Sequence, residues 1–106
     1  MPKYLIQGSY SDQGLKGLLD EGGSKRREAA EQTIKGLGGT LEAFYYAFGK
    51  HDFVVIADLP SNIDASALSL VANESGAVKS WITVLITPEE VDQATKRTVK
   101  FRPPGK

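Results

Sequence analysis

Residues 40–59 read TLEAFYYAFGKHDFVVIADL and hold two strand-like runs on either side of a polar break, Gly49-Lys50-His51. Five of the chain's eight Phe and Tyr residues fall in this stretch. The second run, Phe53 to Leu59, is apolar at nearly every position, which is typical of a strand buried on both faces. The pattern predicts a β-hairpin with which the rest of the chain pairs and packs.

The polar break is compatible with two hairpin registers. A two-residue loop at Gly49-Lys50 sets alternate side chains of the first strand on the face of Phe53. Those side chains are Phe44, Tyr46 and Phe48. A three-residue loop that includes His51 turns the first strand over and moves them to the opposite face. We favour the shorter loop.

Two more strands are predicted, over Lys3–Tyr10 and Val78–Ile86, because apolar and polar residues alternate there. Thr87-Pro88-Glu89-Glu90 is a capping box with proline at the first helical position. The helical segments that we expect are a short turn over 15–19, a helix capped by Ser24 and ending near Leu37, a helix from Ser61 or Asn62 to Gly76, and a terminal helix over 88–96. The packing stripe of the third is expected to comprise Ala65, Leu68, Val71 and Ala72.

The order of elements, β-α-β-β-α-β with a terminal helix, is that of the ferredoxin-like α+β fold. It predicts an antiparallel sheet with helices on one face, in which we expect two neighbouring strands to run parallel. Residues 1–97 should form one domain and residues 98–106 a flexible basic tail.

Composition narrows the class of function. The 106 residues include 13 Lys and Arg against 13 Asp and Glu, so no overall field attracts nucleic acid or a membrane surface. With no cysteine and one histidine, the chain offers no thiolate site and no multi-histidine metal site, and we expect no metal and no cofactor. We find neither a signal peptide nor a run near the ~20 apolar residues of a membrane span, and we expect a cytoplasmic protein.

The uncovered sheet face predicts self-association. Two helices can cover one face, and the other would carry Leu5, Val54, Ile56, Trp81 and Leu85. We expect two chains to pack these faces together as a homodimer, because each ~400 Å² of apolar area removed from water contributes roughly 10 kcal/mol before association costs. The alternative is a monomer whose terminal helix or tail folds back over the sheet.

The best candidates for catalysis are His51 and Asp52, an imidazole beside a carboxylate. Adjacent residues on a strand point to opposite faces, so the alternative is an exposed turn in which Asp52 accepts from backbone donors. Candidate ligand-binding residues near them are Gln7, Ser9, Tyr45, Tyr46 and Trp81, which could hold a small, partly aromatic molecule. The alternative is that these aromatic residues belong to the core.

A second candidate lies at a predicted helix start, where Gly22-Gly23-Ser24 precedes Lys25-Arg26-Arg27. Glycines and cations at a helix N-terminus suit an anion. The order of residues is not that of a phosphate-binding Walker loop, and the alternative is a solvated first helical turn.

The chain resembles the GYD domain family, small proteins related to the dimeric α/β-barrel superfamily, over roughly Tyr4 to Glu90. The segments that carry the resemblance are Ser11-Asp12-Gln13-Gly14, Leu37-Gly38-Gly39, Phe44-Tyr45 and Gly49 to Ile56. His51 stands where a tyrosine is usual in the family. The resemblance implies the fold and self-association, and it implies no particular reaction.

Three functions fit these observations. The first is a homo-oligomeric protein that binds a small molecule in or beside the space between two sheets, in a regulatory or accessory role. The second is a cofactor-independent enzyme of the isomerase, lyase or monooxygenase type, with Asp52 or His51 as general base. The third is an interaction module without a ligand.

Overall fold

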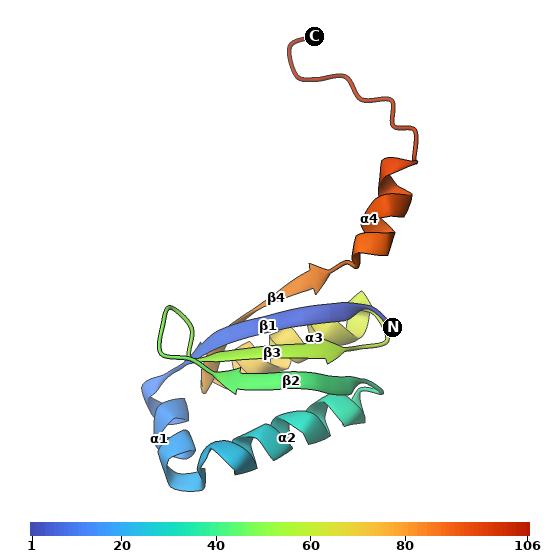
Figure 1. The fold of residues 1–106 in the computed structure, drawn as a ribbon. Helices are drawn as coiled ribbons and strands as arrows, with labels where there is room; N and C mark the ends of the chain where they lie inside the picture. Colours follow the sequence, from blue (N-terminus) through green and yellow to red (C-terminus); the bar gives the residue numbers. More distant parts are fainter.

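The fold is a four-stranded sheet with helices against one side, as the computed structural model of residues 1–106 shows (Figure 1). The strands are β1 (Lys3–Tyr10), β2 (Thr40–Tyr46), β3 (Phe53–Asp58) and β4 (Val78–Leu85). The helices are α1 (Asp12–Glu21), α2 (Gly23–Gly36), α3 (Asn62–Glu74) and α4 (Pro88–Thr95). The order β2-β3-β1-β4 confirms the ferredoxin-like α+β prediction.

All three strand pairings are antiparallel, so the expectation of parallel neighbours was wrong. The β2–β3 hairpin reverses the chain, and β3 then inserts between β1 and β2. The strands β1 and β2 run in the same direction but are separated by β3, and β3 and β4 run in the same direction but are separated by β1.

The β2 side chains of the hairpin face the side of the sheet that we favoured, but the loop is longer than predicted. Tyr46 pairs with Phe53 and Phe44 with Val55, which puts both β2 side chains on the helix-covered face. The loop spans residues 47–52 and is closed by the Ala47 amide, which donates to the Asp52 carbonyl at 2.9 Å. Phe48 lies in this loop and is fully exposed, so its placement on the face of Phe53 was wrong.

The core lies between the sheet and the helices. Its buried residues are Tyr4, Ile6, Ile34, Phe53, Val55, Ala57, Leu59 and Ala65. Helix α2 packs on β2 and α3 packs on β4, and α3 lies behind the strands in Figure 1. Within this chain β3 is buried on one face only, since Val54 and Ile56 on the other face stay half-buried.

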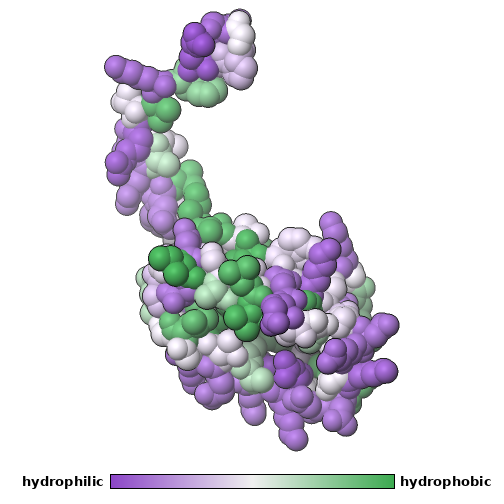
Figure 2. Space-filling view, turned by 180° about the vertical axis from the view of Figure 1, so that it is seen from behind, coloured by the Kyte–Doolittle hydropathy of each residue, from purple (hydrophilic) through white to green (hydrophobic).

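The predicted packing stripe of α3 is partly wrong. Ala65 is buried and Leu68 packs on the core, but Val71 is 68% exposed. Figure 2 views the helix-covered side and shows apolar side chains gathered near the base of the C-terminal arm. The exposed apolar residues on α3 and at the end of β4 are Ile63, Leu70, Val71, Val84 and Ile86.

Helix α1 is a full helix of ten residues rather than a short turn. Ser11 caps it, since its hydroxyl accepts from the Gly14 amide at 3.1 Å and donates to the Gly76 carbonyl at 2.6 Å. Gly14 sits so near the α3–β4 connection that a Cβ there would lie 2.9 Å from the Ala77 carbonyl carbon and nearer still to its oxygen. Helix α2 is capped at Gly22, whose φ is +87°, and not at Ser24.

The other sheet face is open, and we call it the open face. Strand register puts Leu5 opposite Ile56, and Gln7 opposite Val54 and Trp81, as predicted. At one end of this face, the Lys3 Nζ contacts a Glu42 carboxylate oxygen at 2.8 Å and an Asp58 carboxylate oxygen at 2.9 Å. Glu42 occupies a bulge in β2, between Leu41 and Ala43.

The C-terminal arm, residues 86–106, projects away from the sheet and is exposed throughout (Figure 1). The predicted capping box is present: the Glu90 amide donates to the Thr87 hydroxyl at 3.0 Å, and the Thr87 amide to a Glu90 carboxylate oxygen at 2.9 Å. Residues 96–106 form no helix or strand. The arm does not fold back over the open face, and none of the helices is both long and apolar enough to cross a membrane.

Candidate functional site

The predicted ligand-binding residues divide between the two faces of the sheet. Gln7, Ser9, Tyr45 and Trp81 lie on the open face by strand register. Tyr46 lies on the helix-covered face, where its hydroxyl donates to the Gly23 carbonyl at 3.0 Å. Side chains alternate along a strand, so Tyr45 and Tyr46 cannot serve one site within a chain.

His51 and Trp81 come together at one end of the open face. Their ring centroids lie 5.3 Å apart with the planes tilted by 55°, and the Lys79 Nζ lies 5.6 Å from the Trp81 ring. The His51 Nδ1 is buried and has no hydrogen-bond partner. Lys79 was missed in the sequence, although it stands two residues before Trp81 and so shares its face of β4.

Asp52 forms hydrogen bonds with the backbone of β1. Its carboxylate accepts from the Tyr10 amide at 2.9 Å, and its own amide donates to the Gly8 carbonyl at 2.8 Å. These two bonds continue the β1–β3 pairing beyond the end of β3. The Asp52 and His51 side chains form no hydrogen bond with each other, so within this chain they are not an acid–base pair.

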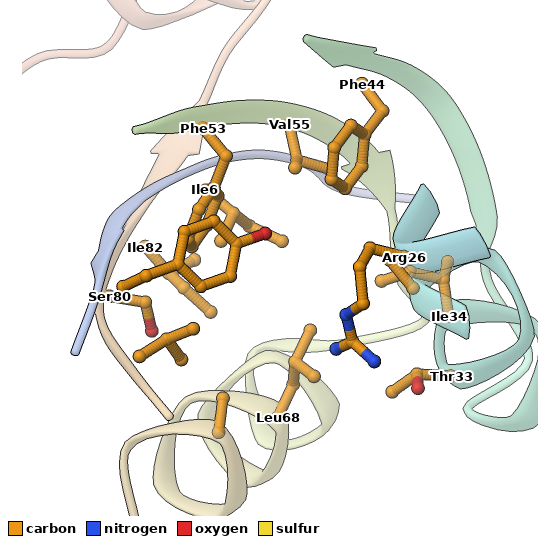
Figure 3. Close-up of a pocket in the computed structure, with 14 residues that line it drawn as sticks. Ile6, Arg26, Thr33, Ile34, Phe44, Phe53, Val55, Leu68, Ser80 and Ile82 are labelled. Carbon is orange, nitrogen blue, oxygen red and sulfur yellow. The ribbon is translucent and has the colours of Figure 1, made fainter. Parts of the chain in front are cut away.

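A mostly apolar cavity lies on the helix-covered side, between the sheet and helices α2 and α3 (Figure 3). Its volume is about 140 Å³, and eleven of its fourteen lining residues are hydrophobic. Because α2 sits over β2 and α3 over β4, the middle of the sheet between them is left with a gap. Short side chains keep this gap open: Ala30 from α2, Ala72 from α3 and Ser80 from β4.

The sheet forms the floor of the cavity with Phe44, Phe53 and Val55, while Leu68 faces them from α3 (Figure 3). Arg26 reaches from α2 into the gap between Phe44 and Leu68 (Figure 3). Arg26 is the only charged residue that lines the cavity.

Tyr10 also lines the cavity, packing its ring against Phe53 with centroids 5.4 Å apart. Burial, and after it the neighbouring Tyr46, raises the pKa of Tyr10 to about 12. The phenol therefore stays neutral at physiological pH.

A comparison with models of known protein families establishes the family of the chain. The family model for the GYD domain matches residues 4–95. The chain belongs to the GYD domain family. The match runs from β1 into the last turn of α4 and leaves out the end of the arm. No curated protein matches the chain at a significant level.

Two of the segments on which the resemblance rests, Ser11 to Gly14 and Leu37 to Gly39, hold the scaffold of this GYD domain together. Ser11 and Gly14 dock α1 on the α3–β4 connection, through a hydroxyl bond to Gly76 and a close approach to Ala77. A Cβ at Gly39, which follows α2, would lie 2.9 Å from the Leu59 side chain and nearer still to the Asp58 carbonyl oxygen. These contacts explain Gly14 and Gly39 sterically and assign their two segments to folding. The other two segments contribute Phe44, Phe53 and Val55 to the cavity lining.

Proposed function

We propose that this GYD-domain protein is a homodimer that binds a small molecule, with one ligand site per chain in the cavity between the sheet and helices α2 and α3. The observation that supports it is the cavity itself, an apolar space of about 140 Å³. Cavities of about 150 Å³ lined by Leu, Ile and Phe bind benzene. A ligand the size of one six-membered ring therefore fits this site.

Binding is better supported than catalysis. Neither Asp52 nor His51 lines the cavity, and the Asp52 carboxylate already accepts a backbone hydrogen bond from Tyr10. A cofactor-independent enzyme that uses either residue as a base would need a second site elsewhere on the chain. We therefore assign the open-face residues, Gln7, Ser9 and Trp81 among them, to the subunit interface.

The cavity is tested with a neutral aromatic probe. Benzamide, titrated at constant buffer composition and followed by NMR, is expected to shift the signals of residues on both sides of the cavity, such as Ile82 and Leu68. Ala72→Leu fills the gap and should abolish these shifts. Ala67→Leu adds the same side chain to an exposed position of α3 and should leave them unchanged. Absence of shifts in the wild-type protein would contradict the ligand site.

The dimer is supported by the uncovered apolar row of the open face, centred on Leu5, Val54 and Ile56. Removing ~400 Å² of apolar area from water contributes roughly 10 kcal/mol, which is comparable to the association cost of roughly 4–15 kcal/mol. Sheet-to-sheet packing is expected to leave the Lys3 ion pairs at its rim, where water can reach them.

Light scattering coupled to gel filtration tests the assembly. A dimer has twice the 11.5 kDa mass of the chain. Ile56→Glu places a charge on the open face and should give a monomer, whereas Ile63→Glu makes the same change on the exposed side of α3 and should leave the dimer intact. A wild-type monomer at micromolar concentration would refute the assembly. We also propose a cytoplasmic location, which cell fractionation tests.

A further inference from the structure

Arg26 places a single positive charge in a mostly apolar cavity. We propose that the ligand is a small monocarboxylate with an apolar body, whose carboxylate binds Arg26 while its ring or branched chain enters the cavity. The inference rests on the proposed function, that the cavity binds a small molecule, and it adds the chemical class of that molecule.

The guanidinium of Arg26 is free to take a carboxylate. Its nearest acidic partner is Glu21, with Nη1 at 3.7 Å from Oε2, which is too long for a hydrogen bond. Both side chains are partly exposed, 40% for Arg26 and 45% for Glu21, so this ion pair is weak. The planar guanidinium can donate two parallel hydrogen bonds to one carboxylate, a geometry that lysine cannot provide.

The rest of the cavity is suited to an anion with an apolar body. No Asp or Glu lines it, and the nearest carboxylate to the Arg26 guanidinium is that of the partly exposed Glu21, which lies outside the cavity lining. Tyr10 adds no negative charge, because its phenol is protonated at neutral pH. With one cation and few other polar groups, the site lacks the several donors that a phosphate dianion needs.

The volume sets the size of the body. About 140 Å³ holds one six-membered ring or a short branched chain, and it is too small for a two-ring acid. Benzoate is therefore the probe of choice, with benzamide as its neutral counterpart of nearly the same shape.

The test compares the two probes by NMR titration at pH 7 and low salt. The wild-type protein is expected to bind benzoate at least about tenfold more tightly than benzamide, and added salt should reduce the ratio. Arg26→Gln should bring the ratio to within about twofold of one while benzamide still binds, which shows that the fold and cavity are intact. Arg27→Gln removes the same charge one residue away, outside the cavity, and should keep the preference.

The outcomes separate this inference from the function on which it rests. Benzamide binding that Ala72→Leu abolishes, without a preference for benzoate, would overturn the carboxylate and leave the cavity site standing. A preference that survives in Arg26→Gln would overturn the role of Arg26. If neither probe binds, both the ligand site and its carboxylate specificity fall.

Discussion

Gly14 and Gly17 lie in the same helix, and alanine at these two positions should change stability in opposite directions. A Cβ at Gly14 would overlap the Ala77 carbonyl, whereas a Cβ at Gly17 meets nothing within 4 Å. Overpacking typically costs about 1–3 kcal/mol, and moving α1 away also breaks two bonds of about 1 kcal/mol each, from the Ser11 hydroxyl to Gly76 and from the Ser11 amide to Ala77. Against this loss, alanine favours the helical conformation over glycine by about 1 kcal/mol.

The expected net loss for Gly14→Ala is therefore about 2–4 kcal/mol, and the expected gain for Gly17→Ala is about 0.5–1 kcal/mol. Urea unfolding and thermal melting, both at one fixed protein concentration, measure the two differences. At about 4–8 °C per kcal/mol for a domain of this size, Gly14→Ala should melt roughly 10 °C or more below the wild type. Melting of Gly14→Ala within two or three degrees of Gly17→Ala would refute the steric reasoning.

Three further substitutions test the roles of Asp52, Tyr10 and His51. Asp52→Ala should lower the free energy of unfolding by about 1–2 kcal/mol, while Asp52→Asn, whose amide oxygen can still accept from the Tyr10 amide, should lose less than half of that; equal losses would contradict the assignment. The pKa of Tyr10 is about 12 in the folded chain and about 10 in the unfolded one, so its neutral phenol stabilises the fold below pH 10 and this contribution is lost as the pH rises through 12. Urea unfolding from pH 9 to 12 measures this loss. The free energy of unfolding of Tyr10→Phe should decrease less over this range than that of the wild type. The difference should be at most about 1 kcal/mol, because the Tyr10 ring is only half-buried. His51→Phe removes the buried Nδ1, which has no hydrogen-bond partner, and keeps an aromatic ring against Trp81. The free energy of unfolding should therefore be unchanged or higher by up to about 1 kcal/mol. A clear loss of stability in urea unfolding would show that Nδ1 has a partner.

The architecture was predictable because side-chain alternation and capping signals are local. Period-two patterning assigned Leu5, Val54 and Ile56 to one face, and Thr87 to Glu90 marked the start of α4. The hairpin loop was not predictable in the same way. Phe48 looked like a strand residue because it is aromatic, yet the backbone leaves the sheet at Ala47 and Asp52 closes the loop. Apolar character alone does not distinguish a buried strand position from an exposed loop.

The candidate site was harder to predict because it is a space left between α2 and α3, and no single residue pattern marks such a space. Periodicity places Ala30 and Ala72 on the inner faces of their helices, but it does not say how far apart α2 and α3 sit on the sheet. Arg26 was noticed in the sequence as one of several cations at a helix start, with a possible anion in view. Only the packing distinguishes it from Arg27, since one side chain lines the cavity and the other does not.

The bulge at Glu42 also limits how copies of the chain can polymerise. A strand laid along the outer edge of β2 would lose its hydrogen-bonding register at this residue. Fibril-like growth of the sheet at that edge is therefore blocked, by one extra residue in the strand.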